Sequence, residues 1–490
     1  MPNEIELKLR IAPEDVLRLR RHPAIRSHLT GKPITRRLVS TYYDTPDLQL
    51  LKKQISLRVR RMSGKWFQAV KGAGHSLAGL HQRMEWEDII ARGAPDFTKI
   101  TAPSLIRIFA DQTLRDALQP IFLTDVQRTE WQLAYEDGTE IEVALDLGKL
   151  EAGDRSEPIR EVELELKKGE TGRLFELAAL LQQSIPLHIE NISKAERGYR
   201  YYYTHNKKTA SRARRTDLPA RSSRMAAFQV IGLECLRQIQ ANQELVMAGD
   251  IEATHQMHIA VRRLKVAFRL FKFKNREIRR EIGWLNALIG STRNWDVLVS
   301  EILPALNQSG QYDQLQQLAS RKQHASYRKL QKAIDSQRYQ AMLLQLGIVL
   351  TKKPGKDGHS IKKLLHRNLH DIYDSLPWDK KRLSDLSEED LHQTRIKIKR
   401  LRYSQEFFAL PELKLLSSRS MISLQKTMGI LNDIHVGKPL LEATAKGLPI
   451  PQRQALAEEI SGWENRLVQR TRRKMQSSWK KLRDQKTRHN

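Results

Sequence analysis

The chain has 490 residues, of which 40% are hydrophobic and 29% charged, so it is long enough for two to four domains and is not intrinsically disordered. Its net charge of +29 is unevenly distributed, because residues 1–200 carry 31 basic and 29 acidic side chains and the remainder carries 54 and 27. The single cysteine, Cys235, excludes an internal disulfide framework and a cysteine-rich zinc site. The apolar stretch at 341–350 is too short to span a bilayer and residues 1–4 do not resemble a secretory leader, so we expect a cytoplasmic protein.

Residues 1–200 show the alternation of charged and apolar residues that is typical of antiparallel strands. The alternating segments are 4–9, 55–60, 82–87, 140–146 and 161–167. Turn sequences such as Ser63-Gly64 and Asp137-Gly138 lie between them, and helical segments are expected near 13–21, 103–117 and 171–183. The pattern predicts an α+β domain rich in antiparallel strands.

The charged residues of these strands form clusters of like sign on one face, because residues i and i+2 share a face of a strand. Glu161, Glu163 and Glu165 would repel one another unless a cation neutralised them, whereas Arg58 and Arg60 would need an anion. A set of oxygen ligands suits Mg²⁺ or Mn²⁺, and arginine side chains suit phosphate oxygens. The clusters therefore predict a site for a metal–polyphosphate substrate, although any single strand could simply have one solvated face.

The remainder of the chain follows a helical pattern. A polar, basic segment at 204–224 is expected to be a linker, and residues 225–490 carry apolar residues at helical spacing, with Asp250 and Ser387 as candidate N-caps. The sequence of residues 255–265 recurs, with substitutions, at 392–402. The repeat predicts an all-α domain built from a duplicated helical bundle.

Basic residues recur at spacings of three and four in both copies of this repeat. They are His255, His258, Arg262, Lys265 and Arg269 in the first copy and His392, Arg395, Lys399 and Arg402 in the second. Because like charges on one helical face repel, two such stripes favour a polyanion as ligand. Zinc binding by His255 and His258, with Glu252 nearby, is a weaker alternative because other strong ligands are absent.

The first 203 residues resemble the CYTH, or triphosphate tunnel metalloenzyme, superfamily. The resemblance rests on an ordered set of matches: Glu4-x-Glu6-x-Lys8, Tyr43-Asp44-Thr45-Pro46, 57–60, Lys71, Arg83, Glu85, Arg128, 144–148, 161–165 and 193–199. It implies an eight-stranded antiparallel tunnel over 1–203 that binds triphosphates with a divalent metal.

On this resemblance, the site residues divide into three groups. The metal ligands are expected among Glu4, Glu6, Asp146, Glu161, Glu163 and Glu165. The substrate phosphates would be bound by Arg58, Arg60, Lys71, Arg83, Arg128 and Lys194. Lys8 and Glu85 are the candidate catalytic residues, with Lys8 orienting or protonating the substrate, and the carboxylate that activates water stays open.

The helical region resembles the CHAD domain, a duplicated α-helical domain that is found attached to CYTH domains and is implicated in binding polyphosphate. His255 and His392 match its histidine positions, while His258 stands where the second copy has Arg395. We therefore assign 225–490 to a polyphosphate-binding domain.

Together these observations predict an inorganic triphosphatase that uses Mg²⁺ or Mn²⁺ and cleaves tripolyphosphate to pyrophosphate and phosphate. Long-chain polyphosphate is the expected partner of the helical domain, with association with polyphosphate granules as a further expectation. Two alternatives are a non-catalytic polyphosphate-binding protein and a triphosphatase or cyclase that acts on thiamine triphosphate or a nucleoside triphosphate. Nucleic acid is a poor candidate partner, because aromatic residues make up only 6% of the chain and no reading motif is present.

Overall fold

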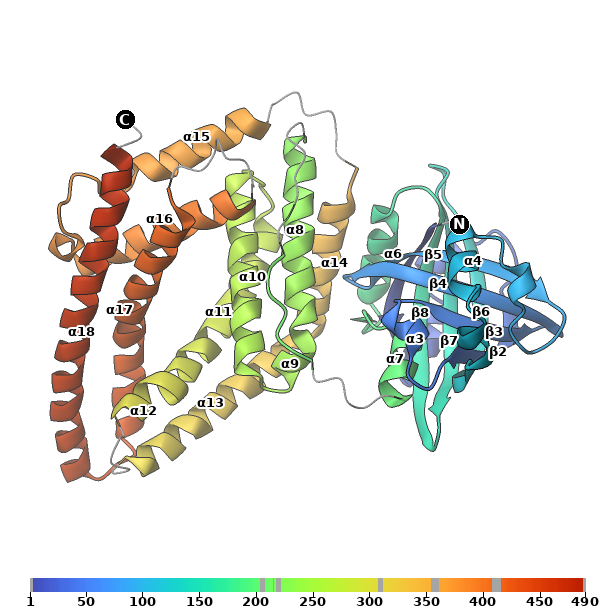
Figure 1. Cartoon of the computed structure of the whole chain (residues 1–490), viewed down its shortest axis with the longest axis horizontal. Coiled ribbons are helices and arrows are strands. Elements are labelled where there is room, and N and C mark those ends of the chain that lie inside the picture. The colour runs from blue at the N-terminus through green and yellow to red at the C-terminus, as the bar shows by residue number, and fades with distance from the viewer. Residues whose placement is uncertain are drawn as a thin grey trace. The chain divides into compact units, whose positions relative to one another are not determined.

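The computed structural model describes residues 3–202, 208–214, 216, 222–306, 312–353, 361–407 and 416–487. The chain divides into two compact units (Figure 1). The first consists of Met1–Lys208 and Ser336–Lys353, and the second of Thr209–Asp335 and Pro354–Asn490. No helix within the described ranges is long and apolar enough to cross a membrane.

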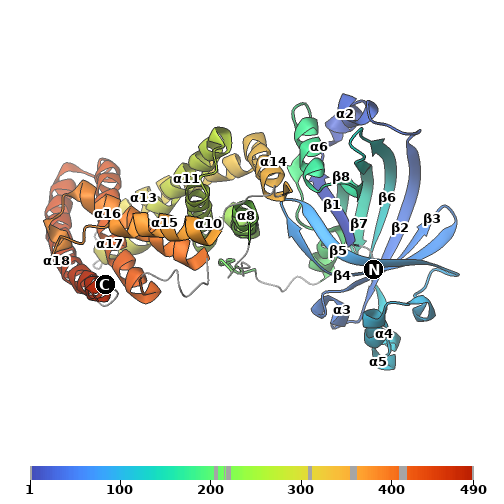
Figure 2. The same ribbon diagram turned by 90° about the horizontal axis from the view of Figure 1, so that it is seen from above.

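A closed antiparallel β-barrel forms the body of the first unit, as Figure 2 shows from above. Its strands are β1 (Asn3–Arg10), β2 (Ile34–Asp44), β3 (Ser56–Met62), β4 (Lys65–Leu77), β5 (Leu80–Ile90), β6 (Gln119–Ala134), β7 (Glu140–Ala152) and β8 (Arg155–Lys168). They pair in the order β5-β4-β3-β2-β6-β7-β8-β1, and β1 also pairs with β5, which closes the sheet. The short strand β9 (His188–Ile189) pairs with the end of β1. The eight-stranded antiparallel tunnel is therefore confirmed.

Helices cover the outside of this barrel and leave its charged face inside. They are η1 (Pro13–Asp15), α1 (Val16–Arg20), α2 (Pro23–Arg26), α3 (Gln49–Lys52), η2 (Phe97–Lys99), α4 (Pro103–Phe109), α5 (Gln112–Asp116), α6 (Gly172–Gln182) and α7 (Lys194–Tyr202). Leu57 of β3, Val70 of β4 and Trp86 of β5 are buried with apolar residues of α3, α4 and α5. Since successive side chains of a strand point to opposite faces, burial of the apolar side turns the charged side toward the interior.

One helix from the later part of the chain belongs to the first unit. Helix α14 (Gln337–Thr351) packs beside α6 (Figures 1 and 2), so closely that a Cβ added at Gly347 would stand 2.3 Å from the ring of Phe175. The side chain of Gln340 accepts a hydrogen bond of 3.0 Å from the backbone nitrogen of Ile189. The assignment of all of 225–490 to one helical domain thus differs from the observed division, because the apolar face of α14 is buried against α6.

Helices alone form the described part of the second unit. They are α8 (Arg224–Ala241), α9 (Gln243–Met247), α10 (Ile251–Leu270), α11 (Arg276–Val297), the π-helical turn η3 (Leu298–Ile302), α12 (Leu303–Leu306), α13 (Asp313–Ile334), α15 (Ile361–Asp374), η4 (Leu383–Asp385), α16 (Glu388–Phe407), α17 (Ser418–Ala445) and α18 (Ile450–Thr487). The helical nature of this region is confirmed.

The internal repeat is visible in the helix boundaries. The offset between the two copies, from His255 to His392, also relates both ends of α10 to both ends of α16, and the start of α8 to the start of α15. Both repeated helices have the N-caps expected from the sequence, since Asp250 accepts from the backbone nitrogen of Ala253 and Ser387 accepts from that of Asp390. Helices α10 and α16 pack against each other, which places the two copies of the repeat side by side.

The expected linker at 204–224 is only partly covered by the described residues, since 204–207, 215 and 217–221 lie outside them. Its described residues include a segment that packs on α8. The backbone nitrogen of Ser211 donates to Asn242 at 2.9 Å, and that of Arg214 donates to Glu234 at 2.7 Å. This segment is therefore held by polar side chains of α8 and its C-terminal end, which the sequence pattern did not indicate.

Candidate active site in the barrel

The interior of the barrel holds a cavity of about 240 Å³ that is lined mostly by charged side chains. All eight barrel strands contribute to it, as does the start of α7. The predicted residues that line it are Glu4, Glu6, Lys8, Arg58, Arg60, Lys71, Arg83, Glu85, Arg128, Asp146, Glu163, Glu165 and Lys194. The period-two alternation explains this convergence, because each strand presents its charged residues at i and i+2.

Glu161 differs from the other predicted residues because it does not line the cavity. Its carboxylate is fully buried and pairs with Lys194 at 2.5 Å and with Arg197. Glu161 therefore anchors Lys194 from behind. Several lining residues were not predicted from the sequence: Tyr42, Glu87, Lys167 and the hydroxyl-bearing Ser40, Ser56, Thr124 and Ser193. Glu87 could have been found, since it follows Arg83 and Glu85 at the same spacing of two.

Two carboxylates of β1 are paired with cations of β1, β4 and β5. Glu4 lies 2.7 Å from the Nζ atom of Lys71, and Glu6 lies 2.8 Å from both Lys8 and Arg83. Although burial alone would raise the pKa of Glu6, Lys8 and other cations hold it well below its ordinary value. Both carboxylates are therefore placed at the cavity wall in contact with cations.

Glu163 is the most heavily paired acid of the cavity. It pairs with Lys8, with Arg128 and, at 2.8 Å, with Lys194. Burial favours its neutral form, but these three cations together hold the pKa of Glu163 well below its usual range. Asp146 shares two of the partners, at 2.7 Å from Arg128 and 2.8 Å from Lys194.

The two candidate catalytic residues are held in charged forms. Burial disfavours a charge on Lys8, but Glu163 and Glu6 outweigh it and raise the pKa of Lys8 above its ordinary value. Burial would likewise raise the pKa of Glu85, but Arg58 and Lys71 lower it to about 2. At neutral pH, Lys8 is a fixed cation that can orient a phosphate, and Glu85 is a weakly basic carboxylate.

Arg60 has a different environment from the other cations of the cavity. Its Nε atom donates to the hydroxyl of Ser40 at 3.0 Å, and no carboxylate within the described ranges forms an ion pair with it. Burial, followed by repulsion from Arg58 and Arg128, lowers the pKa of Arg60 to about 10. Arg58 pairs with Glu85 at 3.0 Å, yet its buried Nε atom has no hydrogen-bond partner. These unused donors face a place where an anion would be stabilised.

The donor chemistry of the cavity fits a hard divalent cation in part. Its walls offer only oxygen ligands from carboxylates, as Mg²⁺ prefers. However, no group of three histidine, cysteine, aspartate or glutamate side chains in the described part of the chain is arranged to hold a metal. Mg²⁺ is commonly bound by one or two carboxylates together with substrate phosphates, so a site completed by the substrate is compatible with this arrangement. The same observation removes support for a zinc site at His255 and His258.

The basic stripes of the second unit meet where α10 faces α16. Burial lowers the pKa of Lys399, and repulsion from Arg262 and Arg395 lowers it further, to about 6. Burial and the nearby Arg262 lower the pKa of His258 to about 3, and burial also lowers that of His255. His258 is therefore neutral at pH 6.5, and His255 gains its charge only below the ordinary histidine value.

The remaining predicted residues of the stripes have other surroundings. Arg402 pairs with Glu406 and donates to Gln425 at 2.8 Å, so its charge is compensated. His392 is exposed, while Lys265 and Arg269 continue the row along α10. Arg293 of α11, and Asn432 and Asp433 of α17, also reach this region, although the sequence did not assign them to a site.

Comparison with known proteins assigns both parts of the chain. Residues 2–199 match the CYTH domain and residues 231–442 match the CHAD domain. An inorganic triphosphatase of Haemophilus influenzae is 36% identical over 201 residues, which are 41% of this chain and 55% of that protein. The chain thus aligns with about half the length of this curated relative.

Solved structures resemble each part separately. The CHAD domain from the plant Ricinus communis is 27% identical with a TM-score of 0.46, over 54% of this chain and 91% of that one. A Hippeastrum protein described as having a dominant triphosphatase activity is 18% identical with a TM-score of 0.30, over 40% of this chain and 96% of that one. The chain thus consists of a CYTH domain over residues 2–199 followed by a CHAD domain over residues 231–442.

Proposed function

We propose that the barrel hydrolyses inorganic triphosphate to pyrophosphate and phosphate. The observation that carries the proposal is the pair Arg58 and Arg60, which line the barrel cavity. The buried Nε atom of Arg58 has no hydrogen-bond partner, and Arg60 has no ion-paired carboxylate in the described structure. A buried guanidinium without a counter-charge is costly, and a phosphate group would supply that charge. The inorganic triphosphatase relative supports the same substrate.

The proposed roles of the residues follow from their charges. Arg58, Arg60, Lys71, Arg83, Arg128 and Lys194 would bind the phosphates and stabilise the charge that develops on transfer. Lys8, held as a cation by Glu6 and Glu163, would orient the substrate within reach of these donors. Glu85 would act mainly by holding Arg58 and Lys71, at 3.0 and 3.1 Å, because its low pKa makes it a poor base.

A divalent cation, Mg²⁺ or Mn²⁺, is part of this proposal. Glu4, Glu6, Asp146, Glu163 and Glu165 line the cavity and would hold the ion, whereas Glu161 lies behind Lys194 and outside the lining. When bound, such an ion would supply positive charge that stabilises the negative charge of the phosphate groups. These carboxylates are paired with lysines and arginines. The ion pairs would therefore open on binding, so that the cations contact the substrate and the carboxylates contact the metal.

The rate of phosphate release separates this proposal from its alternatives. We expect tripolyphosphate to be cleaved faster than ATP or thiamine triphosphate, because the cavity is lined by charged groups and offers no described apolar pocket for a base. Faster cleavage of a nucleotide would favour the nucleoside triphosphate alternative. Absence of release from every substrate would favour a non-catalytic polyphosphate-binding protein.

We also propose that the second unit binds long-chain polyphosphate along α10 and α16. Lys399 and Arg395 are half-buried and have lowered pKa values because burial disfavours their charge and cations crowd them, with Asp433 as a nearby acid. A polyanion would relieve this repulsion, and association with polyphosphate granules would follow. Binding of polyphosphate by the full chain should weaken steeply with salt, and duplex DNA should compete poorly. Equal competition by DNA would show that the stripes are a general basic surface without preference for polyphosphate.

A further inference from the structure

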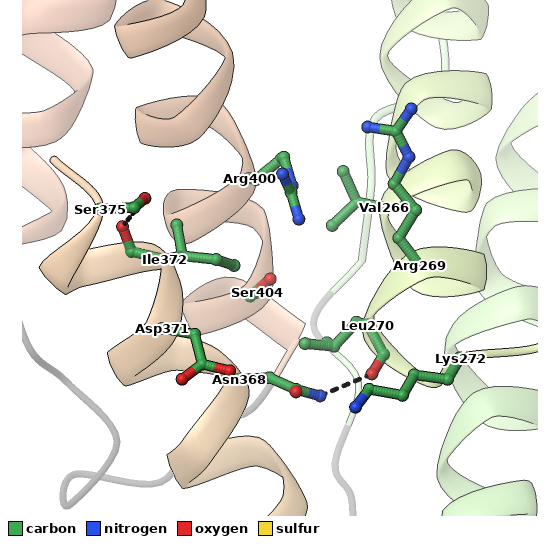
Figure 3. A pocket seen from close by; sticks show the side chains of 10 residues that line it. All are labelled: Val266, Arg269, Leu270, Lys272, Asn368, Asp371, Ile372, Ser375, Arg400 and Ser404. Carbon is green, nitrogen blue, oxygen red and sulfur yellow. Dashed lines mark hydrogen bonds between the residues drawn. The ribbon is translucent and has the colours of Figure 1, made fainter.

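A second pocket, of about 250 Å³, lies in the helical unit between α10, α15 and α16 (Figure 3). Its lining includes three cations, Arg269, Lys272 and Arg400, and one acid, Asp371. Figure 3 shows Arg400 and Arg269 entering the upper part of the pocket from opposite walls, α16 and α10. The pocket belongs to the second unit alone and is separate from the barrel.

The positive charges of this pocket are not compensated by the protein. Within the described part of the second unit, no carboxylate forms an ion pair with Arg269, Lys272 or Arg400. Arg400 is half-buried, and burial together with the neighbouring Arg269 lowers its pKa. Two guanidinium groups therefore face one space in which a negative charge is missing.

The internal repeat shows how the missing charge arises. At the offset that relates α10 to α16, Arg400 corresponds to Arg263 and Arg269 corresponds to Glu406. In the corresponding place, Arg263 lies 3.7 Å from Glu406, so the chain supplies its own carboxylate there. At the pocket, Arg269 stands at the position that Glu406 occupies in the other copy.

The same comparison explains the open space. Arg263 lies over the ring of Phe407, with 5.1 Å from its guanidinium carbon to the ring centre. Phe407 corresponds to Leu270 and Tyr403 to Val266, and these two smaller side chains line the pocket. In one half of the duplicated bundle the arginine is thus covered by a ring and paired with a carboxylate, whereas the other half has smaller side chains and an arginine where that carboxylate stands, with Asp371 as the acid of the pocket.

We propose that this pocket binds a phosphoryl group of a small condensed phosphate, with the guanidinium groups of Arg400 and Arg269 as its main donors. A cavity of about 250 Å³ is smaller than the roughly 300–1,000 Å³ that drug-sized ligands occupy, so one or two phosphoryl groups suit it. Arginine forks match phosphate oxygens in pairs. Asn368 of α15 donates to the carbonyl oxygen of Leu270 at 2.8 Å, which fixes one wall of the pocket against the end of α10.

Hydrogen exchange measured by mass spectrometry on the full chain tests the proposal locally. Pyrophosphate in the presence of EDTA is the probe, and we expect slower amide exchange in peptides that cover residues 266–273 and 366–376. The protection should be lost in Arg400→Gln, and in Arg269→Gln, whose side chain is exposed and whose replacement leaves packing intact. Arg279→Gln, an exposed arginine of α11, is the matched control and should keep the protection.

The outcomes separate this pocket from the barrel and from the two possible sources of the phosphoryl group. If pyrophosphate slows exchange and long-chain polyphosphate does not, the ligand of the pocket is a small free anion. If long chains slow exchange in proportion to the concentration of their ends, the ligand is the end of a polymer. Unchanged exchange with pyrophosphate and with long chains, or equal protection in Arg269→Gln and the wild-type protein, would overturn the proposal. Because the readout is local, binding in the barrel neither produces nor hides it.

Discussion

The ammonium group of Lys71 donates to both carboxylate oxygens of Glu4, at 2.7 and 3.0 Å, and so joins β4 to β1 across the cavity wall. Both side chains are mostly buried, with 12% and 14% of their surface exposed. In the proposed function, this contact would hold a cation for phosphate and an anion for metal in one place.

Glu4→Gln should therefore impair both functions of this contact. We expect turnover of tripolyphosphate to fall by at least about 10²-fold, because the substitution removes a metal-binding charge and leaves Lys71 with Glu85 as its remaining ion-pair partner. Glu140→Gln, an exposed glutamate of β7, is the control and should behave as the wild-type protein does. Wild-type rates in both variants would show that the charged interior is not used in catalysis.

Removal of divalent metal should abolish hydrolysis by the barrel. Mg²⁺ or Mn²⁺ should restore activity after chelation, and Ca²⁺ should inhibit, because it takes more oxygen ligands at longer distances. Phosphate release is followed during titration with each ion. Full turnover after exhaustive chelation would contradict a metal-dependent mechanism.

Arg60→Met should weaken substrate binding and raise the thermal stability of the protein. We expect KM for tripolyphosphate to rise by about 10- to 100-fold, the value of a hydrogen bond to a charged group, while the Tm of the protein rises. The reason for the rise is that the native state no longer buries a guanidinium whose pKa is lowered to about 10.

Arg61→Met is the matched control for this substitution, since Arg61 is the next residue of β3 and its side chain is exposed on the other face. It should leave KM unchanged. A lower Tm in Arg60→Met, or equal KM values in the two variants, would contradict an uncompensated charge that awaits phosphate.

The lowered pKa of Lys399 predicts that the proposed binding of polyphosphate depends on pH. With a pKa of about 6 in the free protein, Lys399 is mostly neutral at pH 7, and a bound polyanion would raise that pKa. Binding at pH 7 should therefore take up protons, and affinity should fall as pH rises from 6. Calorimetry in buffers of different ionisation enthalpy measures this uptake.

The same shift predicts the pH dependence of stability. Between about pH 6 and the ordinary lysine value the unfolded chain binds more protons than the native chain, so the stability of the second unit should rise with pH. Lys399→Met should remove both effects, whereas Lys397→Met on the same helix should keep them. Proton uptake that is unchanged in Lys399→Met would assign it to another group.

The packing of α14 predicts an effect of a distant substitution on the barrel unit. Gly347→Ala should lower the stability of the first unit by about 1–3 kcal/mol, because its Cβ would overlap the buried ring of Phe175. Gly283→Ala in α11 has open space around it and should be neutral or slightly stabilising. Chemical unfolding followed by tripolyphosphatase activity reports on the first unit. Equal stability of the two variants would show that α14 does not support the barrel.

Much of this site could be predicted from the sequence, because alternation in a strand assigns each residue to a face. Glu4, Glu6, Arg58 and Arg60 were placed together in this way, and the ordered family motifs supplied the closure of the sheet. The alternation shows which face of the sheet a side chain belongs to, but not how deeply that side chain is buried. For this reason Glu161 was expected in the cavity, although it lies behind Lys194.

Features that depend on packing between distant segments could not be predicted. The low pKa of His258 results from burial and from cations of other residues, including Lys399 of α16. The position of α14 beside α6 likewise depends on contacts between segments far apart in the sequence, such as the hydrogen bond from Ile189 to Gln340. Such contacts leave no periodic signal in either segment.

The most direct test of the central claim is ³¹P NMR of tripolyphosphate incubated with the full chain and Mg²⁺. The account predicts equal amounts of orthophosphate and pyrophosphate, formed at a rate that falls at least about 10²-fold in Glu4→Gln. Intact tripolyphosphate, or the same rate in the wild-type protein and Glu4→Gln, would contradict it.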